Sequence, residues 1–357
     1  KNPKKISFEA GNLYEVLSGH LNELKINDFL IKDGEFDYET YQGPDYDNFK
    51  IKGLTFEVNN FQLNEKADAR TDKIFYTDDI FLEIRDQVLF LKDSIHKITF
   101  DRFYISTSDN EFGFEKFNLT RRKDPHSNVK SHDHYEISLP MLRLAGIDFI
   151  SAYNDNLLNV DSILILDPTI NIKKRNQKQK KDSSRHSILD AAMIYHDYLK
   201  IENFDLVDAH LIYTDETKDI PKQYSIDHIS THITDVEIDT GRYSKYRYGF
   251  NFDKADLMVK DYEVNLPDSL NTVKFSEFSI SSDPFEIKLK DLNIQPNSTQ
   301  NKNINKSQFF ATVPYMVITE FDVAKAINLD TFLINEIYLE NPDIKIIPTN
   351  NNNAKND

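Results

Sequence analysis

The stretch VDSILILDPTINI (Val160–Ile172) has an echo near the end of the chain, INEIYLENPDIKI (Ile334–Ile346). Both contain an apolar run, then Asp or Asn, then proline, and then the pattern x-Ile-x-Ile. The two prolines, Pro168 and Pro342, stand 174 positions apart. Alternation of apolar with other residues is typical of a β-strand that has one buried face. The echo therefore predicts a strand that occurs twice in the chain.

Further matches at an offset of 175 surround this echo. The paired stretches are Glu23–Glu39 with Tyr198–Thr214, Asn48–Leu63 with Gln223–Ile238, Leu91–Ser106 with Leu266–Ser281, and, after the loss of one residue, Tyr135–Asp148 with Phe309–Asp322. Four matches in the same order indicate a duplication. We expect a first repeat with an N-terminal helix over residues 1–180, a second repeat over 181–348 and a disordered tail over 349–357.

Several predicted strands change phase in the middle. In KITFDRFYIS (Lys97–Ser106), Ile98 and Phe100 are expected on one face of the strand, and Phe103 and Ile105 on the other. The second copy repeats this change. A bulge or a sharp bend would produce it, and bulges curve and twist a sheet. The pattern therefore favours a curved, trough-like sheet over a flat sandwich.

Helical spacing is confined to short segments. The expected helices are Asn12–Leu21, Ser187–Leu199, a segment from Phe149 with Asp148 as its N-cap, and a segment from Val323 with Asp322 as its N-cap. The other strands expected by alternation include Asp79–Leu91 and Glu111–Leu119. The predicted fold is mainly β with short helices: two tandem repeats of about 175 residues that form a curved antiparallel sheet with an apolar groove.

The composition excludes several classes of function. A net charge of −16 argues against general nucleic-acid binding, because neutralising phosphates requires a surplus of Lys and Arg. The chain has no cysteine, so disulfides and thiolate-ligated metals are excluded. The sequence contains no run of 18 or more apolar residues, so no membrane-spanning helix is expected. Because the sequence starts at Lys1, we expect it to be a fragment of a longer protein that carries a targeting or anchor segment.

Few residues suggest chemistry. His126, His132 and either Asp133 or His134 could converge on zinc or copper, but the corresponding stretch of the second copy has no histidine, so surface histidines are the preferred interpretation. Asp33 with Asp208, and Asp148 with Asp322, recur in both copies, which fits cap or turn residues better than catalysts. We expect no enzymatic activity, no cofactor and no bound metal.

A basic stretch, NIKKRNQKQKKDSSRH (Asn171–His186), lies between the copies. The simplest interpretation is a solvated linker or loop. The alternative is a contact with anionic lipid headgroups, which attract clustered Lys and Arg.

A curved sheet with an apolar face suits a long acyl chain, because apolar contact makes no directional demand on the bound molecule. Tandem units would extend such a surface. The residues predicted to line the lipid groove are Ile98, Phe100, Ile163, Ile165, Ile170 and Ile172 in the first copy, and Val273, Phe275, Ile337, Leu339, Ile344 and Ile346 in the second.

The run YEISLPMLRLAGIDFISAYNDNLLNVDSILILDPTINI (Tyr135–Ile172) resembles the AsmA/TamB-like envelope proteins of Gram-negative bacteria. The likeness lies in the order of an alternating strand, Gly-Ile-Asp, a short helix and a strand that ends in Asp-Pro. Phe309–Ile346 repeats it with Glu-Phe-Asp in place of Gly-Ile-Asp. The resemblance implies the repeating β-groove fold of bridge-like lipid-transfer proteins, a periplasmic location with a membrane anchor in the full-length protein, and phospholipid as cargo.

Two functions follow as hypotheses. The first is a lipid-binding and lipid-transfer protein of the cell envelope, acting in phospholipid transport or outer-membrane biogenesis. The alternative is a non-enzymatic β scaffold subunit of an outer-membrane or periplasmic protein complex. The expected partners are a phospholipid or another acyl lipid and an envelope membrane-protein complex, with no nucleic acid.

Overall fold

The computed structural model describes residues 21–42, 45–65, 72–90, 96–121, 134–174, 198–217, 221–239, 250–266, 271–297, 308–320 and 334–348. This part of the chain is one large, curved β-sheet with the short helix α3 (Phe149–Asn154). The strands before α3 are β1 (Leu24–Gln42), β2 (Asp45–Leu63), β3 (Asp79–Phe90), β4 (His96–Ser106), β5 (Glu111–Arg121) and β6 (His134–Ala145). Those after it are β7 (Leu157–Leu166), β8 (Thr169–Lys174), β9 (Tyr198–Asp215), β10 (Lys222–Asp239), β11 (Phe250–Asn251), β12 (Lys254–Asn265), β13 (Asn271–Ser282), β14 (Phe285–Pro296), β15 (Gln308–Thr319), β16 (Glu336–Glu340) and β17 (Asp343–Ile347).

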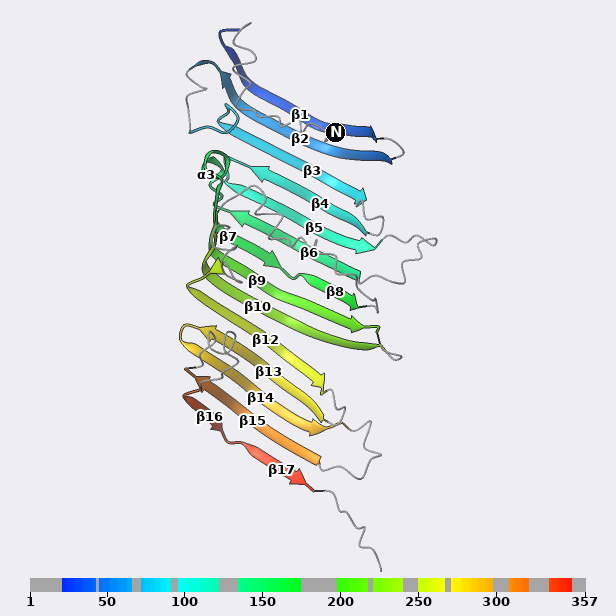
Figure 1. The fold of residues 1–357 in the computed structure, drawn as a ribbon, viewed down its shortest axis with the longest axis vertical. Coiled ribbons are helices and arrows are strands. Elements are labelled where there is room, and N and C mark those ends of the chain that lie inside the picture. The colour runs from blue at the N-terminus through cyan, green and yellow to red at the C-terminus, as the bar shows by residue number, and fades with distance from the viewer. Residues whose placement is uncertain are drawn as a thin grey trace, which may run out of the picture.

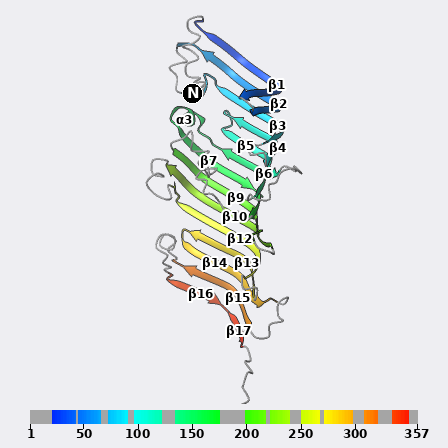
Figure 2. The ribbon, with the colours of Figure 1, turned by 45° about the vertical axis from the view of Figure 1, so that its right-hand side comes forward.

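The strands form a ladder that follows the order of the chain, from β1 at one end to β17 at the other (Figures 1 and 2). From β1 to β6, and again from β12 to β15, each strand pairs antiparallel with the next. β6 pairs with β7 along one half of its length and with β8 along the other. β15 pairs in the same way with β16 and β17. Asp167–Pro168 separates β7 from β8, and Asn341–Pro342 separates β16 from β17.

The sheet is mixed, so the expectation of a wholly antiparallel sheet was wrong at one place. β7 and β8 pair parallel with β9. Two parallel neighbours need a long connection that brings the chain back to the same end of the sheet. Residues 175–197 make this connection, and they include most of the stretch for which a linker or a lipid-headgroup contact was predicted.

The predicted strands Asp79–Leu91, Lys97–Ser106 and Glu111–Leu119 are confirmed as β3, β4 and β5. α3 is also confirmed, and Asp148 caps it by accepting a hydrogen bond of 3.0 Å from the Ser151 amide.

The other predicted helices fall largely outside the described residues. Leu21 is the one residue of Asn12–Leu21 that is described, and the segment from Val323 is not described at all. The last two residues of Ser187–Leu199, Tyr198 and Leu199, begin β9, so the predicted helix was wrong there, where strand pairing overrides helical spacing. The tail 349–357 is also outside the described residues.

Buried apolar residues occur from β2 to β15, and one cluster of them lies near the middle of the ladder. Leu199, Ile201 and Ile238 form a buried cluster on β9 and β10, with Ile163 and Phe204 packed against it. Val160 and Pro168 are the largest side chains that are fully buried in the described part of the chain. By contrast, every residue of β16 and β17 is exposed.

Candidate functional site

A line of residues with left-handed backbone conformation crosses the sheet, and we call it the crease. It contains Asp33, Gly53, Asp86, Lys116, Asp167, Asp208, His228, Asp261, Asp291 and Asn341, whose φ angles lie between 44° and 60°. Most are Asp or Asn, which tolerate this conformation better than other residues with a side chain. Asp33 and Asp208 were predicted to be cap or turn residues. They lie instead within β1 and β9.

The crease is continuous because strand pairing skips one position at the same level in neighbouring strands. Between β3 and β4 the pairing passes from Arg85–Arg102 to Gln87–Phe100, which leaves out Asp86. Three other strand pairs skip one residue in the same way: Lys116 between β5 and β6, Asp261 between β12 and β13, and Asp291 between β14 and β15.

Side chains satisfy backbone groups along the crease. The side-chain amide of Gln87 donates hydrogen bonds to the backbone carbonyl oxygens of Lys52 (2.6 Å) and Arg85 (2.8 Å). The backbone N–H of Asp208 donates to Ser230 Oγ at 3.1 Å. The interruption is therefore a built part of the sheet, since unpaired buried backbone groups would be costly.

The crease shifts side-chain alternation by one residue. The ring centroids of Phe100 and Phe103 are 6.3 Å apart, and Phe100 is 5.4 Å from Phe114 on the next strand. Phe275 and Phe278 are 6.0 Å apart on β13. Because these rings touch, residues on both sides of the crease share one face of the sheet. The expectation that Ile98 and Phe100 face away from Phe103 and Ile105 was wrong, since the interrupted pleat restores the common face.

Two apolar rows result, one on each side of the crease, and together they form what we call the apolar face. Directly opposite partners share a face of a sheet, so the rows can be followed from strand to strand. The first row runs through Ile84, Phe103, Phe114, Leu142, Ile165 and Leu206, and again through Val259, Phe278, Leu289, Met316 and Leu339. The second runs through Ile98, Leu119, Ile137, Ile170, Leu211 and Ile226, and again through Val273, Ile294, Ala311 and Ile344.

The residues predicted to line a groove all lie on the apolar face, either in one of the two rows or two positions from a row member on the same strand. Four lie on the first row's side of the crease, namely Ile163, Ile165, Ile337 and Leu339. Eight lie on the second row's side, namely Ile98, Phe100, Ile170, Ile172, Val273, Phe275, Ile344 and Ile346. Their exposure varies with position along the ladder. Phe100 is 7% exposed, and Ile346 on the edge strand is 64% exposed. The role of these residues in binding stays a prediction.

The opposite face carries charged side chains in pairs across strands. Arg102 donates to Glu83 at 2.6 Å and to Glu115 at 2.9 Å, so it joins β3, β4 and β5. Lys290 and Glu277 form an ion pair of 2.7 Å between β13 and β14. Burial alone would raise the pKa of Glu83, but hydrogen bonds from Arg85 and Arg102 outweigh it, and the pKa lies below its ordinary value.

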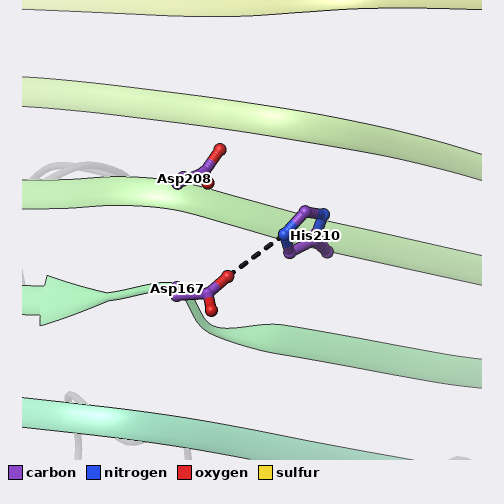
Figure 3. A group of neighbouring side chains, drawn as sticks. All are labelled: Asp167, Asp208 and His210. Atoms are coloured by element: carbon purple, nitrogen blue, oxygen red, sulfur yellow. Dashed lines mark hydrogen bonds and ion pairs between the residues drawn. The ribbon is translucent and has the colours of Figure 1, made fainter.

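The structure also gathers polar residues that the sequence analysis did not connect. Asp167, Asp208 and His210 approach one another where β7, β8 and β9 meet (Figure 3). Asp208 and His210 stand two positions apart on β9, but no motif spacing could have added Asp167, which the parallel pairing of β7 and β8 with β9 brings beside them. The sequence also offered His126, His132 and either Asp133 or His134 as metal ligands. His126, His132 and Asp133 lie outside the described residues, as does the side chain of His134.

No family model matches the sequence, and no curated protein matches it. Within the described residues, no helix is both long enough and apolar enough to cross a bilayer.

Proposed function

We propose that the chain is a non-enzymatic lipid-binding and lipid-transfer protein of the cell envelope, with acyl chains carried along the apolar face. One observation carries the proposal: apolar rows follow one face of a single sheet from β3 to β10 and again from β12 to β17, and charged pairs occupy the other face. In the described residues the sheet has no second β layer on its apolar face. An acyl chain on that face would gain about 25 cal/mol for each Å² of apolar surface removed from water.

The proposal includes two tandem repeats that extend one groove. Support comes from the crease, where Asp33, Gly53, Asp86 and Lys116 have left-handed counterparts 175 positions later, at Asp208, His228, Asp261 and Asp291. Outside the crease, Asn60 and Asp235 form a further left-handed pair at the same offset. Backbone conformations recur at the same offset as the sequence matches. Repeats that stack edge to edge would make a surface longer than either unit offers alone.

A scaffold role in an envelope complex is the second candidate. The observation that favours it is the edge of the sheet at β16 and β17, where all ten residues are exposed. An exposed edge strand can pair with a strand of another protein. A periplasmic location with a membrane anchor remains part of both proposals.

The test is mass spectrometry of lipids that co-purify with the chain without detergent. We expect phospholipid in near-stoichiometric amounts from the unaltered chain. The double variant Ile165→Asp with Leu339→Asp places two carboxylates on the apolar face and should remove most of this lipid. Its matched control is Leu164→Asp with Tyr338→Asp. These residues neighbour the first pair but point to the other face, and Tyr338 is 50% exposed where Leu339 is 41% exposed.

Circular dichroism establishes that each variant is folded. Equal lipid loss in both double variants would contradict the assignment of the apolar face. A folded, unaltered chain that carries no lipid, and that moves no fluorescent phospholipid between vesicles, would overturn lipid transfer and favour the scaffold.

A further inference from the structure

The cluster of Asp167, Asp208 and His210 has the composition of a metal site (Figure 3). One potential ligand atom from each residue lies within 4.8 Å of the others. Nε2 of His210 is 3.1 Å from a carboxylate oxygen of Asp167. Imidazole nitrogen together with carboxylate oxygen suits zinc and other divalent transition metals.

The sheet fixes the backbone of this cluster. The N–H of Asp167 donates to the carbonyl of Val207, and the N–H of His210 donates to the carbonyl of Pro168, each at 2.8 Å. These bonds lie at the break between β7 and β8 and bridge the two stretches of parallel pairing with β9. The three side chains therefore start from positions that the fold sets, and an ion would not have to order a loop.

Two further residues orient the cluster. Nδ1 of His210 is 3.2 Å from a carboxylate oxygen of Asp227. In the tautomer that has its proton on Nδ1, His210 donates to Asp227 and leaves the Nε2 lone pair free for a metal. A carboxylate behind a histidine is the usual support of a metal ligand. Nδ1 of His228 likewise lies 2.6 Å from Asp208.

The charge of the cluster differs from that of the matching region in the first half of the chain. Glu35 stands 175 positions before His210 and forms an ion pair with Lys50. The position 175 after Lys50 is Ser225, so the second half lacks this lysine. The carboxylates of Asp167 and Asp227 are 60% and 53% exposed, so an ion could reach them from solvent.

We infer that Asp167, Asp208 and His210 bind a divalent transition-metal ion, for which Zn²⁺ is the probe, and that this ion ties β7 and β8 to β9. Asp227 and His228 are positioning residues. This inference is independent of lipid binding, because His210 lies opposite Thr169 on the face away from Leu211.

The first measurement is calorimetric titration of the metal-free chain with Zn²⁺. We expect a saturable site whose dissociation constant rises at least about tenfold in His210→Gln, and by about 10- to 100-fold in the positioning variant Asp227→Asn. His232→Gln is the control, since it removes another His–Asp pair, the half-buried contact of His232 with Asp205 at 2.7 Å. It should bind as the unaltered chain does. Zn²⁺ should also raise the Tm of the unaltered chain but not that of His210→Gln.

Asp167→Asn keeps the size and backbone preference of the residue and provides a second test should His210→Gln fail to fold. The histidines at 126, 132 and 134 could also bind Zn²⁺, so the triple variant His126→Gln, His132→Gln, His134→Gln is titrated in parallel. A site that survives His210→Gln and is lost in the triple variant overturns the inference. So does the absence of saturable binding by the folded, unaltered chain.

Discussion

The two copies of the echo meet different surroundings in the fold. β7 and β8 lie between β6 and β9, and Pro168 between them is fully buried. β16 and β17 pair with β15 at the end of the described sheet, and Pro342 between them is exposed. The same strand–break–strand pattern is therefore an interior element once and an edge element once. Position in the ladder, rather than pattern, decides how deeply each copy is buried.

The largest expected effect is on the free energy of unfolding, when a buried interior residue and its exposed counterpart 174 positions later are each truncated to alanine. Val160 is 2% exposed, whereas Ile334 is 42% exposed. Val160→Ala should lower the free energy of unfolding by about 2 kcal/mol, because buried methyl groups are lost and a cavity remains. Ile334→Ala should cost less than about 0.5 kcal/mol. Chemical denaturation measures both, and equal losses would contradict the contrast between interior and edge.

The crease offers the next comparison. Asp261 in β12 and Asn341 at the edge both have positive φ, at 51° and 44°. Asp261→Val should destabilise the chain by about 1–2 kcal/mol, because a β-branched residue resists the left-handed conformation. Asp261→Gly, which accepts that conformation, is the control. Asn341→Val should leave global stability nearly unchanged and speed hydrogen exchange in β17 alone, since edge strands open locally.

The smallest expected effect concerns charge on the polar face. The Glu83 side chain is 10% exposed, and hydrogen bonds from Arg85 and Arg102 keep its pKa below 4.5. A lowered pKa in the folded state stabilises the fold above the unfolded value, and this stabilisation is lost as the pH falls through the folded value. Glu83→Gln should therefore cost about 1 kcal/mol at pH 7 and nothing at pH 2.

Denaturation at several pH values checks this prediction. Glu340→Gln on the exposed edge is the matched control and should change stability by less than about 0.5 kcal/mol at either pH. If Glu83→Gln lowers the free energy of unfolding by the same amount at every pH, packing rather than charge explains the loss.

Much of the strand structure could be predicted because alternation is a local property. β3, β4 and β5 begin and end within about two residues of the predicted ranges, and Asp148 caps α3 as expected. The phase change in Lys97–Ser106 also indicated an interruption of the strand, but the faces on either side of it were assigned wrongly. Whether two runs of alternation share a face depends on backbone angles at the break, such as those at Asp86 and Lys116 in the neighbouring strands.

The sequence by itself determined the elements of this protein: alternating strands, an offset of 175 between matched stretches, and Asp or Asn at the interruptions. These are set by residues near one another in the chain, where steric preference and hydrophobic period act directly. The tertiary structure decided the parallel junction of β8 with β9, the exposure of β17, and the meeting of Asp167 with His210. Those features depend on which strands become neighbours after a long connection, and no local preference encodes that choice.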